Sequence, residues 1–109
     1  MAKPKTTSIG ISKGTSLEVT VAGQNGSAVC TAGALEGGDF TNWSPKMLEK
    51  GVTYKPGGSC ALEFLVDFLD TSASALTITV ERGEKQPKKW TVEGKDGALQ
   101  TWQLWVLVD

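Results

Sequence analysis

Histidine is absent from this chain of 109 residues, and tyrosine occurs only once. Without an imidazole, general acid–base catalysis and the activation of a nucleophile lose the side chain that most often performs them. The sequence therefore predicts a protein that is not an enzyme. Two cysteines without histidine do not complete a tetrahedral zinc site, so neither a metal nor another cofactor is expected.

Long apolar runs and net charge are lacking as well. No stretch approaches the roughly 18 apolar residues of a membrane-spanning helix, and the basic start MAKPKTTS is not followed by the apolar segment of a signal peptide. The expected location is cytoplasmic, or outside the cell after export by a non-classical route. A net charge of −1 argues against nucleic acid as a partner. Ordinary composition predicts a single domain over 1–109, with flexibility at 1–6.

Alternation of apolar and polar residues is the strongest pattern that is present. Together with the glycine, proline and asparagine turns, it predicts about eight short strands. Most of them fall at 6–11, 16–22, 27–32, 52–54, 75–82, 88–93 and 99–108. An all-β chain of this kind predicts a single antiparallel β-sandwich rich in hairpins, with a small barrel as the alternative.

Turn residues between these strands predict three antiparallel hairpins. The first joins the strands around Asn25-Gly26, the second passes through Asp70 to Ser74, and the third turns at Lys95-Asp96-Gly97. The glycine-rich segment 33–45 predicts a long ordered loop, with a short edge strand around 39–42.

Two further segments need their own interpretation. Ser44-Pro45 predicts a single helical turn that ends at Gly51, because proline is tolerated at the first helical position. The segment 60–69 fits either a strand or a helix by its apolar spacing. Its aromatic content and the strands on both sides favour a strand.

The last predicted strand carries a candidate contact surface. Trp102 and its alternate neighbours are expected to fill the core, together with Trp90, which leaves Trp105 and Leu107 pointing outward. Large apolar side chains on an outer face are typical of a subunit or ligand surface, although they also occur beneath loops.

Other aromatic and basic residues are weaker candidates for binding. Lys88 and Lys89 adjoin Trp90, and a basic cluster with an indole suits an anionic lipid headgroup, a sialylated glycan or an acidic partner. The alternative is a solvated segment whose lysines discourage edge-to-edge pairing. Trp43 is interpreted either as a stacking platform for a sugar or as a plug over one end of the sandwich, and Tyr54 is a further candidate contact.

Carboxylates and thiols complete the set of candidate sites. Glu63 and Asp67 share a face and can be read as a glycosidase pair, but a solvated polar face is the interpretation that the pattern favours. Cys30 and Cys60 are expected to be buried thiols, with a disulfide between two strands as the alternative.

The run LEKGVTYKPGGS, residues 48–59, resembles segments of aegerolysin-type β-sandwich proteins. That resemblance implies binding to membrane lipids and action together with pore-forming partners. The residues themselves favour another function: a non-enzymatic recognition or assembly module for a glycan, a protein or a second copy of the chain. Binding would use the loop aromatics and the outer face of the last hairpin, and a homo-oligomer is expected.

Overall fold

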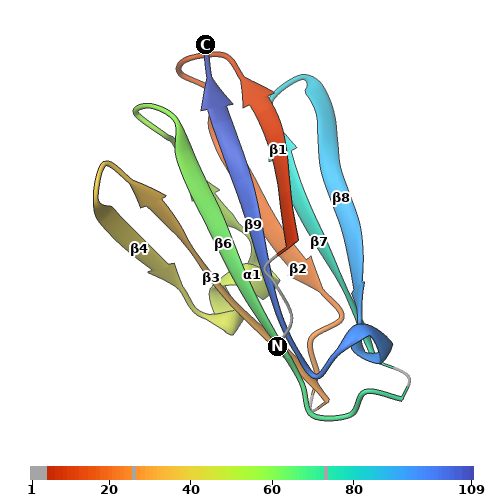
Figure 1. The fold of residues 1–109 in the computed structure, drawn as a ribbon. Coiled ribbons are helices and arrows are strands. Elements are labelled where there is room, and N and C mark those ends of the chain that lie inside the picture. The colour runs from red at the N-terminus through yellow and green to blue at the C-terminus, as the bar shows by residue number, and fades with distance from the viewer. Residues whose placement is uncertain (1–4, 26, 73) are drawn as a thin grey trace.

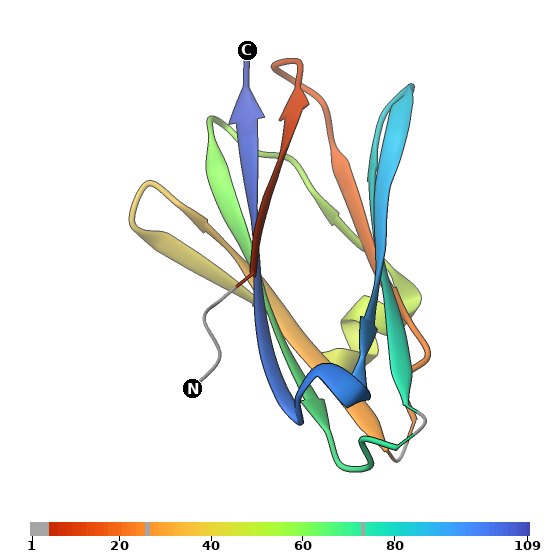
Figure 2. The ribbon, with the colours of Figure 1, turned by 45° about the vertical axis from the view of Figure 1, so that its right-hand side comes forward.

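The computed structural model describes residues 5–25, 27–72 and 74–109, and these form two β-sheets that face each other (Figures 1 and 2). The strands are β1 (Lys5–Ile11), β2 (Leu17–Ala22), β3 (Ala28–Glu36), β4 (Asp39–Trp43), β5 (Val52–Tyr54), β6 (Cys60–Phe68), β7 (Ala75–Arg82), β8 (Lys85–Glu93) and β9 (Leu99–Val108). Two short helices, α1 (Pro45–Lys50) and the 3-10 turn η1 (Gly94–Asp96), join them. The predicted all-β sandwich is confirmed. The flexibility predicted for 1–6 concerns residues 1–4, which lie outside the described residues, and residues 5 and 6, which belong to β1.

The two sheets have five and four strands. The five-stranded sheet has the order β1-β9-β6-β3-β4, and the four-stranded sheet has the order β5-β2-β7-β8. Neighbouring strands are antiparallel except for β1, which runs parallel to β9.

Within the described residues, none of the three hairpins that the turn residues predict pairs its two strands, and at the first turn only an isolated antiparallel bridge joins Asn25 to Ala28. β2 and β3 lie in different sheets, and so do β6 and β7, and β8 and β9. The connections at these three places cross from one sheet to the other, and Figure 2 shows them together at one end of the sandwich. Alternation fixes which face of a strand is buried, but a strand of either sheet has the same alternation.

The hairpins that do exist have two-residue turns. β3 and β4 are joined by Gly37-Gly38, both with positive φ, and β7 and β8 are joined by Gly83-Glu84. Positive φ at both central residues suits the twist of a tight hairpin. The long loop predicted for 33–45 is wrong at 33–36, because β3 continues to Glu36. The short edge strand predicted around 39–42 is confirmed as β4, which lies at the edge of the five-stranded sheet.

Two other predictions about local structure are confirmed. The ambiguous segment 60–69 is a strand, β6. The helical turn α1 begins after Ser44, whose Oγ accepts a hydrogen bond from the Met47 amide at 3.2 Å. It ends at Gly51, whose φ of 104° favours glycine. No helix among the described residues is long and apolar enough to cross a lipid bilayer.

The core lies between the sheets and consists of the inward residues of both. Val92 is buried, and Trp90 and Trp102 pack against the core while remaining partly exposed, as the alternation predicts. Leu48 of α1 is fully buried, so the helix covers one side of the sandwich where the chain passes from β4 to β5.

Candidate functional site

The outer side of the five-stranded sheet carries most of the exposed large hydrophobic side chains that the structure describes. We call it the apolar face. Its members are half-exposed and project from β3, β4, β6 and β9: Val29, Leu35, Phe40, Leu65, Leu99, Trp105 and Leu107. They alternate along each strand with residues of the core, so the same strands that build the sandwich also hold these side chains on a rigid surface.

An apolar row crosses four strands of this face. In register, Trp105 of β9 lies opposite Ala61 of β6, Ala61 opposite Leu35 of β3, and Leu35 opposite Phe40 of β4. Ala61 is only 3% exposed although it points outward, because larger side chains stand on both sides of it. The row is therefore continuous from β9 to β4.

The next row is polar and contains a glycine. Gln103, Glu63, Gly33 and Asn42 follow one another across β9, β6, β3 and β4. A Cβ added to Gly33 would lie 2.5 Å from Cζ of Phe40, which shows that the phenyl ring lies directly on the glycine. The absence of a side chain at residue 33 thus provides the space for the ring of Phe40 on the sheet.

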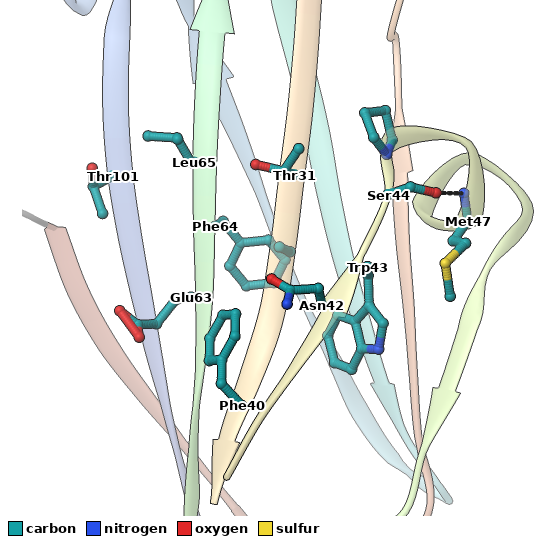
Figure 3. A pocket seen from close by; sticks show the side chains of 12 residues that line it. Thr31, Phe40, Asn42, Trp43, Ser44, Met47, Glu63, Phe64, Leu65 and Thr101 are labelled. Carbon is teal, nitrogen blue, oxygen red and sulfur yellow. Dashed lines mark hydrogen bonds between the residues drawn. The ribbon is translucent and has the colours of Figure 1, made fainter. Parts of the chain in front are cut away.

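A pocket of about 640 Å³ opens on the β4 side of the apolar face (Figure 3). Phe40, Asn42 and Trp43 come from β4, while Glu63 and Leu65 come from β6. The complete lining is Thr31, Ala32, Phe40, Asn42, Trp43, Ser44, Pro45, Met47, Glu63, Phe64, Leu65 and Thr101. A largely apolar wall with a few polar groups is the usual composition of a binding pocket.

The wall of this pocket is fixed where β4 leaves β3. β4 pairs only with the far half of β3, up to the pair Ala32 and Trp43. Beyond that point the side chain of Gln24 makes the hydrogen bond to β3 that a neighbouring strand would make. Its Oε1 accepts a hydrogen bond from the Cys30 amide at 3.0 Å, and its Nε2 donates one to the Pro45 carbonyl at 2.9 Å. The start of α1 is thereby tied to β3 beside the pocket.

The charged side chains on the apolar face are all acidic. The strands β3, β4, β6 and β9 contain neither lysine nor arginine. The ionisable side chains on their outward positions are Glu63, which is half-buried, and Asp67, which is exposed. The surface is therefore apolar with a negative charge near its centre.

Trp105 and Leu107 are exposed by 45% and 53%, as the sequence predicts. They lie on the apolar face, but this face is not the outside of a hairpin, because β8 and β9 are in different sheets. Their neighbours are instead β1 and β6.

Trp43 at the end of β4 and Tyr54 at the end of β5, both predicted contacts, are engaged within the fold. Trp43 is only 3% exposed and packs edge-on against Tyr54, with ring centroids 5.7 Å apart, so it acts as the plug and not as an open platform. The Tyr54 hydroxyl donates to Glu36 at 2.6 Å, and burial together with this carboxylate raises the pKa of Tyr54 well above its usual value.

The basic cluster around Trp90 does not form one surface. Trp90 packs inward against Phe64 and Trp102, with centroid distances of 5.7 Å to each ring. Its neighbour Lys89 points outward from β8 and is exposed, whereas Lys88 is half-buried. Alternation along one strand directs the indole and the exposed ammonium to opposite sides.

Cys30 and Cys60 are both buried, and both are free thiols. Cys30 lies opposite Val66 of β6, six positions along that strand from Cys60, which is about 20 Å at the usual rise of a strand. A disulfide between them, the alternative that the sequence leaves open, does not occur for this reason. Burial raises the pKa of Cys30 to about 12 and that of Cys60 to about 11, so neither thiol is a reactive thiolate near neutral pH.

The carboxylates of Glu63 and Asp67 share the outer side of β6 but are four positions apart. At about 3.3 Å per residue their separation along the strand is about 13 Å. Glycosidase pairs lie about 5 to 9.5 Å apart, so these two do not have the required geometry. Among the described residues no group of three or more cysteine, aspartate or glutamate side chains lies close enough to hold a metal ion.

Sequence reasoning misses residues of the apolar face and of its pocket. Leu35 and Phe40 fall in the segment 33–45 that glycine content assigns to a loop. The signal that identifies them is Gly37-Gly38, since two glycines between residues of strand type predict a two-residue hairpin. Glu63 is noticed only as a catalytic candidate, because its aromatic neighbour, Phe40, is distant in sequence.

Comparisons of the chain with protein-family models, curated proteins and solved structures give no match. The resemblance to aegerolysin-type proteins therefore depends on residues 48–59 alone. Within the structure these residues form the end of α1, β5 and the turn before β6.

Proposed function

We propose that this protein is a non-enzymatic recognition module that binds a partner protein through the apolar face. The observation that carries the proposal is the distribution of exposed hydrophobic side chains: seven lie on the strands of the five-stranded sheet and none on those of the four-stranded sheet, among the described residues. A contiguous apolar surface on one side of a small domain is typical of a docking site.

The width and length of the face set an upper limit on its area. Five strands spaced by about 4.8 Å give a width of about 19 Å, and a strand the length of β9 extends about 31 Å. Because β9 is the longest of the five strands, the area is at most about 600 Å², which is smaller than the roughly 800 Å² that each partner contributes to a standard protein–protein interface. An indole on this face, that of Trp105, belongs to the residue type most enriched among energetically dominant contacts.

Selection from a random peptide library tests the proposal. Peptides displayed on phage are selected on the wild-type protein and on a Trp105→Thr/Leu107→Thr variant, which keeps good strand formers at both positions. We expect peptides that bind the wild-type protein at least about tenfold more tightly than the variant, because the apolar anchors are lost. Isothermal titration of individual peptides gives the affinities.

A matched control carries Thr79→Ser/Thr91→Ser on the outer side of the four-stranded sheet, and circular dichroism verifies that both variants are folded. The control should bind every selected peptide like the wild-type protein. Enrichment that ignores the Trp105→Thr/Leu107→Thr change would contradict the proposal, as would specific binding to a glycan array that this change leaves unaltered.

A further inference from the structure

Glu63 is an ionisable side chain in an unusual position. It lies in the middle of β6, half-buried, between Gln103 of β9 and Gly33 of β3. Within the described part of the chain the ion pair that forms is Lys95 with Glu93, on the other side of the molecule, and Glu63 has no such partner. β3, β4, β6 and β9 hold no basic residue, and Lys5 of β1 in the same sheet lies over the ring of Trp102, so no countercharge of the sheet is paired with this carboxylate.

An aromatic ring lies beside the side chain of Glu63. Phe40 covers Gly33, and Gly33 is the direct cross-strand neighbour of Glu63. Side chains at paired positions are about 5 Å apart at Cβ, so a ring lying on the glycine is adjacent to the side chain of Glu63. Figure 3 shows both groups lining the pocket, with Leu65 on the same strand as Glu63.

From this arrangement we infer that the pocket receives a lysine or arginine side chain of the partner protein, held between the carboxylate of Glu63 and the ring of Phe40. The inference rests on the proposed function and specifies the partner's chemistry. A cation gains from both groups, by direct charge attraction and by interaction with the face of the ring. The aliphatic stem of the same side chain packs against Leu65 and Met47, which line the pocket.

A partner that buries the apolar face needs a cation opposite Glu63 in order to bind. A partner that covers the apolar face removes water from Glu63, and a carboxylate that loses water without gaining a countercharge opposes binding. Partners with an acidic or purely apolar contact surface are therefore selected against, whereas a basic and apolar segment satisfies the whole surface. Charge complementarity thus identifies the occupant: a protein segment in which apolar residues flank a lysine or arginine.

Three synthetic peptides of equal length test the inference: one alternates leucine with lysine, one leucine with glutamate, and one leucine with serine. Each is fluorescein-labelled and titrated with the protein by fluorescence anisotropy. We expect the lysine peptide to bind most tightly, and Glu63→Gln to weaken it about tenfold because the charge is removed without a change of shape. Phe40→Leu, which keeps an apolar side chain but removes the ring, should weaken it by about threefold or more.

Glu18→Gln is the matched control, since Glu18 is an exposed carboxylate on the outer side of the four-stranded sheet. It should leave the affinity of the lysine peptide unchanged. In a ¹⁵N-labelled sample, the lysine peptide should shift the amide signals of Glu63, Phe40 and Leu65 and leave those of β2 and β7 in place.

The inference is overturned if Glu63→Gln has no effect, if Glu18→Gln weakens the peptide equally, or if none of the peptides binds. Its failure is distinct from failure of the proposed function. If the serine peptide binds as well as the lysine peptide and loses its affinity to Trp105→Thr/Leu107→Thr, the apolar face remains a docking surface and the cation pocket is rejected. If the lysine peptide binds the Trp105→Thr/Leu107→Thr variant as tightly as it binds the wild-type protein, the docking surface and the cation pocket are both rejected.

Discussion

The two outer surfaces of this sandwich differ although the sheets behind them follow one pattern. Both sheets alternate inward apolar residues with outward ones, and both contribute to the same core. The outer side of the four-stranded sheet is rich in threonine, at Thr20, Thr53, Thr77, Thr79 and Thr91. The outer side of the five-stranded sheet instead carries leucine, phenylalanine and tryptophan.

The comparison shows what the fold does not require. A threonine surface is sufficient for a stable outer face of a sheet, because threonine favours strands and tolerates water. Seven exposed apolar side chains on the other sheet therefore need a reason beyond folding, and the partner binding that we propose would provide one. Charge follows the same division, since the lysines of β8 have no counterpart on β3, β4, β6 or β9.

The largest expected effect is a loss of stability at high pH, and it concerns the inner surfaces of the sheets. Both buried thiols, Cys30 and Cys60, belong to the five-stranded sheet. Above pH 9 the unfolded chain loses protons from Cys30 and Cys60, whereas the folded chain retains them until about pH 12 and 11. The unfolded state then binds fewer protons, so stability falls as the pH rises. The expected loss is about 1.4 kcal/mol per pH unit for each thiol. Urea unfolding between pH 9 and 10, with a reductant present, measures it.

A Cys30→Ala/Cys60→Ala variant provides the control for this titration. Its free energy of unfolding is lower at neutral pH, because small cavities form, but it should change little between pH 9 and 10. Above pH 10, Tyr54 adds a further loss in both proteins, since its pKa is also raised. An equal slope for the variant and the wild-type protein would show that the thiols are not the source.

A smaller effect is expected on the apolar face itself, at Gly33. The Cβ of alanine there meets the ring of Phe40 and the carbonyl oxygen of Thr41, so either the ring or β4 must move. Gly33→Ala should lower the free energy of unfolding by about 2 kcal/mol, the usual cost of an overpacked site. Urea unfolding measures the loss.

Gly10→Ala separates crowding from a general effect of removing glycine. Gly10 lies on β1 of the same sheet, and its nearest atom would be the Leu107 carbonyl oxygen at 4.0 Å. This change should be neutral or slightly stabilising, because alanine costs less conformational entropy than glycine. Similar losses for Gly10→Ala and Gly33→Ala would refute the close contact of Phe40 with the sheet.

The smallest effect is expected at the end of β8, beside the threonine surface. Lys95 and Glu93 form an ion pair at 3.2 Å, with exposures of 72% and 45%. Exposed pairs of this kind contribute little, so Lys95→Ala should change the free energy of unfolding by less than about 0.5 kcal/mol. A thermal unfolding series at low and high salt checks this, and a loss well above 1 kcal/mol would show that the ion pair stabilises the end of β8.

Much of the fold follows from local pattern alone. Alternation identifies β2, β6, β7 and β9 and assigns their faces correctly, because a buried side requires apolar residues at every second position. The pairing of strands does not follow from it. Asn25-Gly26 suggests a hairpin, yet the chain crosses there to the opposite sheet, and only the complete set of strands decides which neighbour is available.

The candidate site is predictable in part for a related reason. Trp105 and Leu107 are found by reading a single strand, whereas the contact of Phe40 with Gly33 beside Glu63 requires three strands in register. Trp43 and Trp90 illustrate the opposite case: large aromatic residues attract attention in a sequence, but most of them serve the core.

Because of the position of β9 in its sheet, the five-stranded sheet can be completed only late in synthesis. β9 lies between β1 and β6, and β1 has no other neighbour in its sheet. While a ribosome is still translating residues 75–98, β1 has already emerged but has nothing to pair with, and the edge of β6 is open. The five-stranded sheet closes only when 99–108 leave the exit tunnel, so maturation waits for the contact of longest sequence separation.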